Sequence, residues 1–172
     1  MMGFGCRLLS ASVGALAVVA VAACGQATPP EPAAPANPLA GAWSVSAITG
    51  ADGVTIDPAQ PGLFVFTDGH YSAVYTPGAE PRPASATHFV ATDEEALAQF
   101  QSFIVNAGTY SVDGSTITFR PSIARAPEFV GGQATAEFEI AGDVLTLRYQ
   151  TIVSAGGANA PDVGSMTLRR LE

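Results

Sequence analysis

The two histidines of this chain are candidates for binding a metal ion or a haem group. His70 follows a glycine between two apolar runs, and His88 stands in a polar stretch after several prolines. Neither has a cysteine or a second histidine at the short spacing that metal sites use, so we predict no metal. We expect both side chains to be solvated, one in a turn and one in a loop. Haem binding through one of them stays open as an alternative.

Glu94 and Glu95 are a second candidate for chemistry, because a pair of carboxylates can act as general acid and general base. The segment from Thr92 to Glu95 also has the form of a capping box, which begins a helix. Apolar residues then recur at helical spacing, and the pattern predicts a helix from Asp93 to about Val105. The positive end of the helix dipole explains these acidic residues better than catalysis does. We therefore predict no catalytic residue and no enzyme activity.

Cys24 is the third candidate, and it ends an uncharged segment of 16 residues, 8–23, that follows Arg7. At about 1.5 Å per residue a helix of this length spans about 24 Å, which is short of the roughly 30 Å hydrocarbon core of a bilayer. A secretion signal is therefore favoured over a permanent membrane span. Val21-Ala22-Ala23-Cys24 resembles the lipobox of bacterial lipoproteins. The resemblance implies a signal peptide over residues 1–23 and a lipid on Cys24; cleavage by an ordinary signal peptidase, with Cys24 incidental, is the alternative.

Residues 24–38 are predicted to be a tether between this anchor and a folded domain over residues 39–172. Five prolines among alanines favour an extended backbone that buries no core. Gly25, rather than an aspartate, follows Cys24, and this resembles the default sorting of lipoproteins to the outer membrane of a Gram-negative bacterium. We expect the domain to face the periplasm.

The charge of the mature chain argues against a nucleic-acid partner. All seven basic residues of the sequence are arginines, and Arg7 would leave with the signal peptide, so six arginines would face 15 acidic residues. Such a balance gives no electrostatic attraction to nucleic acid or to anionic lipid. Cys24 would then be the only cysteine, so the domain is expected to be stable without a disulfide bond.

The domain itself alternates apolar and polar residues in short runs, which is typical of antiparallel strands with one buried face. Glycine-containing turns separate many of these runs. The pattern predicts an all-β domain with the one helix between the third and fourth of eight strands, at residues 42–49, 62–67, 70–76, 108–112, 115–120, 133–140, 144–150 and 165–171.

Two Asp-Gly pairs predict tight hairpins, because type I′ turns need positive φ at both central residues. Across Asp68-Gly69 we expect Phe66 to face Tyr71 and Phe64 to face Ala73. Across Asp113-Gly114 we expect Tyr110 to face Ile117 and Val112 to face Ser115. Consecutive hairpins with one apolar face favour closure into an eight-stranded antiparallel up-and-down barrel, which leaves no exposed sheet edge.

Three segments together resemble the bacterial lipocalin-like domain: Gly41-Ala42-Trp43, the hairpin from Gly62 to Ser72, and Gly108 to Val112 after a helix. The resemblance implies a calyx for a small hydrophobic ligand. It also implies that Trp43 closes one end of the barrel beneath an arginine of a late strand. We expect Arg170 in that role, with Arg169 as the alternative if the strand register shifts by one residue.

The aromatic side chains on the expected inward face are the candidate ligand-binding residues. They could line an open calyx or fill the barrel, and an eight-stranded barrel permits both. Arg82 and Arg125, in predicted loops, could meet an acidic group of a ligand at the mouth. The alternatives to a carrier are a filled barrel that acts as an inhibitor or envelope-assembly module, and an isomerase, cyclase or haem protein. The candidates are Phe64, Phe66, Tyr71, Tyr75, Tyr110, Phe119, Phe138 and Tyr149.

Overall fold

The computed structural model describes residues 37–160 and 164–172. The predicted signal peptide, Cys24 and the tether up to residue 36 lie outside the described residues. At the end of the predicted tether, Asn37 contacts the domain, because its side-chain amide donates to the Tyr110 hydroxyl over 2.5 Å.

Each of the eight predicted strands is present, within a few residues of its expected bounds. A ninth, two-residue strand at Thr55–Ile56 (β2) was not predicted; it pairs with the end of the first strand. The other strands are β1 (Gly41–Thr49), β3 (Gly62–Phe66), β4 (His70–Tyr75), β5 (Ile104–Asp113), β6 (Thr116–Ala124), β7 (Gln133–Ala141), β8 (Val144–Val153) and β9 (Ser165–Arg170).

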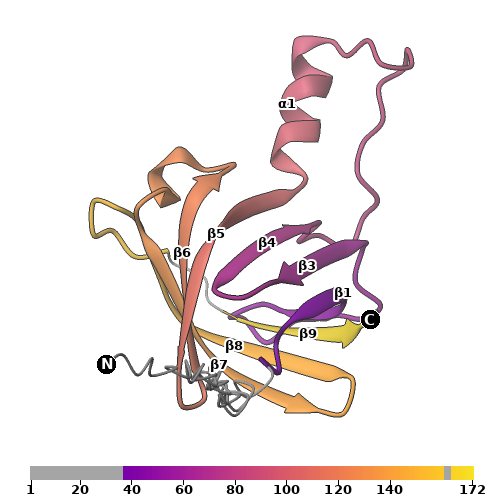
Figure 1. Ribbon diagram of the computed structural model, residues 1–172. Coiled ribbons are helices and arrows are strands. Elements are labelled where there is room, and N and C mark those ends of the chain that lie inside the picture. Colours follow the sequence, from indigo (N-terminus) through magenta and orange to yellow (C-terminus); the bar gives the residue numbers. More distant parts are fainter. Residues whose placement is uncertain (1–36, 161–163) are drawn as a thin grey trace, which may run out of the picture. The chain divides into compact units, whose positions relative to one another are not determined.

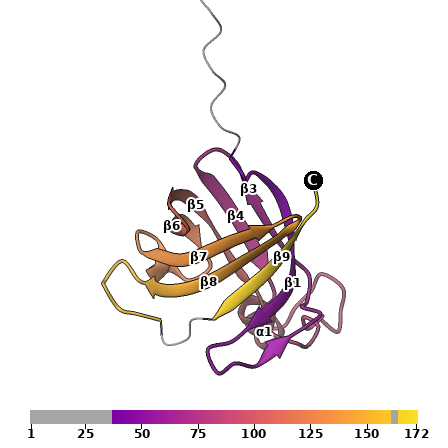
Figure 2. The ribbon, with the colours of Figure 1, turned by 90° about the horizontal axis from the view of Figure 1, so that it is seen from below.

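The strands form a closed antiparallel barrel, as the sequence predicted. Neighbours in the chain are neighbours in the sheet from β3 to β9, and β1 pairs with β3 on one side and with β9 on the other. Figure 2 shows β1 and β9 side by side, completing the ring. Closure pairs both long edges of the sheet, which is the physical advantage of this topology.

The first Asp-Gly hairpin has the predicted register but not the predicted turn type. Phe66 pairs with Tyr71 and Phe64 with Ala73, so these side chains share the inner face. Gly69 has a φ of +77°, whereas Asp68 has no positive φ. The turn is therefore not type I′: only the glycine, which lacks a Cβ, adopts the left-handed conformation.

The prediction for the second hairpin was wrong in register. Asp113 pairs with Thr116, Val112 with Ile117 and Tyr110 with Phe119. The turn is thus formed by Gly114 and Ser115, and each partner lies two residues further along than expected. A shift of two residues keeps every side chain on its predicted face, because side chains alternate with a period of two.

The predicted helix begins where expected but ends earlier. Helix α1 spans Asp93–Gln101 with Ser102 as its C-cap, whereas Ile104 and Val105 belong to β5 and pair with Tyr75 and Val74 of β4. Strand pairing at the barrel wall therefore overrides the helical spacing of these last residues. Figure 1 shows that α1 and its preceding loop, the 76–103 arm, project from one end of the barrel.

No residue of α1 is buried, although the sequence shows an apolar spacing on it. Leu97 and Phe100 are 56% and 50% exposed. Among the described residues, no helix has the length and apolar character needed to cross a membrane.

Candidate functional site

The barrel contains a cavity of about 580 Å³, and its lining includes Tyr75, Pro77 and Ile104 at the base of the 76–103 arm. This volume lies within the roughly 300–1,000 Å³ typical of small-molecule sites. Its wall is mainly apolar and comes from strands all around the barrel, from the loop after β6 and from Phe129 of the short 3₁₀ helix η1 (Pro127–Phe129). This part of the interior is therefore open rather than filled.

Five of the eight candidate aromatic residues line this cavity. Phe119 is central, because its ring packs edge-on against Tyr71, with centroids 4.8 Å apart, and tilts against Tyr149 at 6.4 Å. Such aromatic contacts fix the rings in place without filling the space between them. The five are Phe64, Tyr71, Tyr75, Phe119 and Tyr149.

The other three candidates do not line the cavity. Phe66 and Tyr110 pack edge-on at 5.4 Å, both buried, and the Tyr110 hydroxyl donates to the Thr67 carbonyl over 2.9 Å. Phe138 packs partly buried against the core. Phe66, Tyr110 and Phe138 lie near the hairpin turns, where the barrel is packed solid, so an inward-facing position alone did not distinguish core from calyx.

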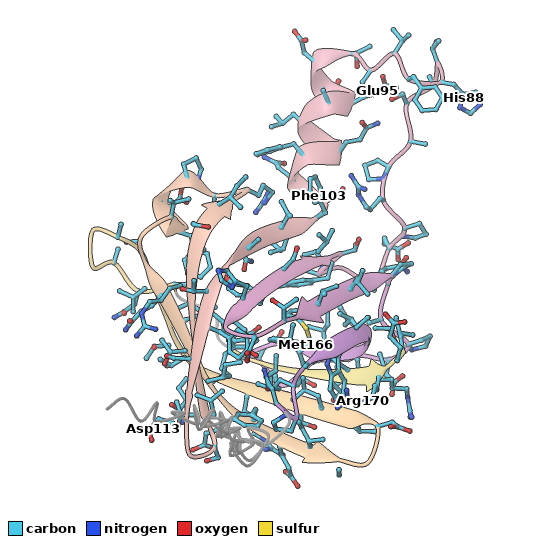
Figure 3. The ribbon with its side chains drawn as sticks, viewed as in Figure 1. His88, Glu95, Phe103, Asp113, Met166 and Arg170 are labelled. Carbon is cyan, nitrogen blue, oxygen red and sulfur yellow. The ribbon has the colours of Figure 1, made fainter. Side chains whose placement is uncertain are left out.

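Several cavity residues were missed because they are small or aliphatic. Ala73 and Ala134 leave open space between the aromatic rings, and Ile104 and Met166 complete the wall. Figure 3 places Met166 among the strands of the barrel. The signal for Ala73, Ala134 and Met166 was the same alternation that identified the aromatics, whereas Ile104 fell in the predicted helix. Ala136, the next inward-facing residue after Ala134 on β7, is buried but does not line the cavity.

Three tyrosine hydroxyls in the cavity are held in their neutral form. Burial raises the pKa of Tyr71 and of Tyr149 well above the ordinary value, and the neighbouring hydroxyls of Tyr75 and Tyr71 add to the effect on Tyr149. Burial also raises the pKa of Tyr75 to about 12, although nearby Arg125 opposes this shift. All three tyrosines and Arg125 line the same cavity, where the phenols are hydrogen-bond donors at neutral pH.

The two loop arginines have different positions. Arg125 lines the cavity; its Nη1 donates to the Phe100 carbonyl over 3.2 Å, and its guanidinium lies 5.4 Å from the Phe100 ring centre. Arg82 does not line the cavity. It stacks over Phe103 at 4.6 Å and donates to Ser102 Oγ and to the Gln99 carbonyl.

Trp43 and Arg170 are in contact near the opposite end of the barrel. The Arg170 guanidinium lies 4.0 Å from the centre of the Trp43 ring, and the indole Nε1 donates to the Leu39 carbonyl over 2.8 Å. Arg170 also donates to the carbonyls of Ala40 and Pro38. Gly41 has a φ of +120°, and a Cβ there would lie 2.6 Å from the Glu172 carbonyl oxygen, so glycine is required at this position.

The histidines and the glutamate pair lie outside the cavity. His70 is exposed at the start of β4, and His88 is exposed on the arm, as Figure 3 shows for His88. Glu95 accepts the backbone N–H of Thr92 and of Ala86, and both bonds lower its pKa. Within the described residues, no group of three or more His, Cys, Asp or Glu side chains is arranged to hold a metal ion.

Comparisons with known proteins identify the family of this chain. A crystal structure of a lipocalin-like protein from Bacteroides uniformis is similar, with a TM-score of 0.44 and 17% sequence identity over 77% of this chain and 98% of that one. A search of curated proteins found no match. The profile of a family described as lipocalin-like domain matches residues 40–170. The chain therefore belongs to the lipocalin-like domain family.

Proposed function

We propose that this protein binds a small hydrophobic molecule in the barrel and is held in the bacterial envelope by a lipid on Cys24. The observation that supports ligand binding is the open cavity of about 580 Å³ with a mainly apolar wall. A cavity this large would leave its lining without packing partners when empty, so an apolar ligand that fills it gains both burial and contact energy.

The anchoring part of the proposal rests on the sequence from Val21 to Gly25 and on the proline-rich residues that follow it. A lipid on Cys24 and sorting to the outer membrane would keep the barrel in the periplasm, where apolar molecules have to cross an aqueous space. A carrier with an enclosed apolar interior suits that environment.

The alternative of a filled barrel that acts only through its outer surface is disfavoured by the cavity volume. The alternatives of an isomerase, a cyclase or a haem protein can be tested by identifying the molecule that copurifies with the protein. Native mass spectrometry of protein purified from its own host should show a bound apolar molecule if the proposal holds. Retained haem would instead support the haem protein, and an empty barrel with a bound protein partner the interaction module.

The proposed site can be tested directly with N-phenyl-1-naphthylamine, an uncharged probe whose fluorescence rises in apolar surroundings. Ala134 is 3% exposed and lines the cavity, so Ala134→Phe should fill part of the space. We expect the affinity for the probe to fall about tenfold or more, since overpacking a wall costs about 1–3 kcal/mol.

The matched control is Ala141→Phe, which makes the same change at an exposed position on the same strand, β7. It should bind the probe as the unmodified protein does. Equal binding by both variants, or no binding by the unmodified protein, would contradict a ligand site in the barrel.

A further inference from the structure

We infer that the ligand of the cavity carries an anionic acceptor group, such as a carboxylate, which binds between Arg125 and the three tyrosine hydroxyls. This inference rests on the proposed function, because it assigns the chemical class of the molecule that the apolar cavity holds. The cavity would then have an apolar part for the body of the ligand and one polar position for its acceptor group.

The first argument is that this part of the cavity holds unsatisfied donors. In the described part of the chain, only two buried side-chain polar atoms lack a hydrogen-bond partner, Tyr71 Oη and Arg125 Nε. Both residues line the same cavity. A buried polar group without a partner costs about 1–3 kcal/mol, so two of them on one cavity wall indicate a group that a ligand completes.

The second argument is the sign of the partner. Tyr75 and Tyr149 also line the cavity, and their hydroxyls make no hydrogen bond to the described residues. Burial keeps all three phenols protonated, so each can donate, and a guanidinium can only donate. Three phenols and a guanidinium on the wall of one cavity call for an acceptor, and the positive charge of Arg125 favours a negative one.

The third argument concerns competition from the protein. Glu128 is the only acidic residue among those that line the cavity, and its side chain is exposed. The one ion pair between described residues joins Arg148 and Glu139, so no described carboxylate neutralises Arg125. Nη1 of Arg125 is engaged by the Phe100 carbonyl, which orients the guanidinium while Nε stays without a partner.

The experiment compares dodecanoate with 1-dodecanol, which has the same chain and no charge, as competitors of N-phenyl-1-naphthylamine near neutral pH. We expect dodecanoate to displace half of the probe at a concentration at least about tenfold below that needed with 1-dodecanol. The reason is that hydrogen bonds to charged groups are stronger than those to neutral groups. Arg125→Met, which keeps the bulk of the side chain, should remove this preference, because it weakens the binding of dodecanoate more than the binding of 1-dodecanol. Tyr71→Phe should weaken the binding of dodecanoate more than the binding of 1-dodecanol.

Arg82→Met is a matched control, because Arg82 also stacks on a phenylalanine and donates to a carbonyl of the last turn of α1 but does not line the cavity. It should keep the preference for dodecanoate. Equal displacement by the two competitors, or a preference that survives Arg125→Met, would overturn the inference while probe binding still supports the proposed function. Absence of probe binding would overturn both.

Discussion

Two arginines, one near each end of the barrel, differ in the interactions that they make. At the closed end, Arg170 combines a stacked contact with Trp43 and two hydrogen bonds to the carbonyls of the segment before β1. At the open end, Arg125 lines the cavity, is oriented by one carbonyl and retains a buried nitrogen without a partner. The first arginine has all its strong interactions within the protein, which is typical of a structural residue, whereas the second does not.

Arg170→Ala should lower the free energy of unfolding by about 2 kcal/mol, since it removes a cation–π contact and two charge-assisted hydrogen bonds from a partly exposed position. Urea unfolding followed by the fluorescence of Trp43, the single tryptophan of the chain, measures this change. Arg169→Ala is the matched control, because Arg169 is exposed on the same strand and should shift the midpoint little. Equal destabilisation by the two variants would contradict a special role for Arg170.

Among the elements, α1 depends least on the barrel for its stability. Its nine residues include none that is buried, so its local stability comes largely from its ends. Thr92 Oγ1 accepts a hydrogen bond from the Glu95 N–H over 3.3 Å. In turn, the Glu95 carboxylate accepts hydrogen bonds from the backbone N–H groups of Thr92 and Ala86. A helix this short is marginal in isolation, so this capping box and the contacts of Arg82 and Arg125 with its last turn hold it in place.

Thr92→Ala should destabilise α1 by about 1 kcal/mol without changing the unfolding of the barrel, because the lost cap bond is local. Hydrogen exchange should show faster exchange of the helix amides and unchanged protection of β8. Thr87→Ala is the control, since Thr87 is exposed on the same arm and its side chain makes no hydrogen bond to the described residues. A fall in the urea midpoint of the whole domain would show that the helix is coupled to the barrel after all.

The whole molecule combines an acidic barrel with a single proposed attachment to the membrane. The net formal charge of the full sequence is −8, and no lysine is present, so electrostatic attraction to anionic lipid is not expected to hold it at a bilayer. Under the proposal, the lipid on Cys24 is therefore the whole of the membrane attachment.

Cys24→Ser should move the protein from the membrane fraction to the aqueous fraction of the cell envelope, because serine cannot accept the thioether-linked lipid. Immunoblotting of separated membrane and periplasmic fractions measures the change. Cys6→Ser is the matched control, since it alters the other cysteine of the chain and should leave the protein with the membrane. Retention of the Cys24→Ser protein on the membrane would contradict the tether.

The sequence by itself determined which side chains face inward, where the first hairpin turns and where the helix begins. These features depend on near neighbours: alternation places Phe64, Tyr71 and Phe119 on the inner face, and Thr92 with Glu95 starts α1 within one turn. Even the wrong register of the second hairpin preserved those faces, since the error was two residues.

Only the tertiary structure decided which inward residues line a cavity and which form the core. Phe66 and Phe119 follow the same alternation, yet Phe119 lines the cavity and Phe66 packs outside it, because depth along the barrel depends on how all strands stagger when β1 meets β9. The pairing of β5 with β4 ended α1 at Gln101, and the closed barrel placed Arg125 in the lining of one cavity with three tyrosines from β4 and β8. Such contacts join residues far apart in the chain, and no local pattern encodes them.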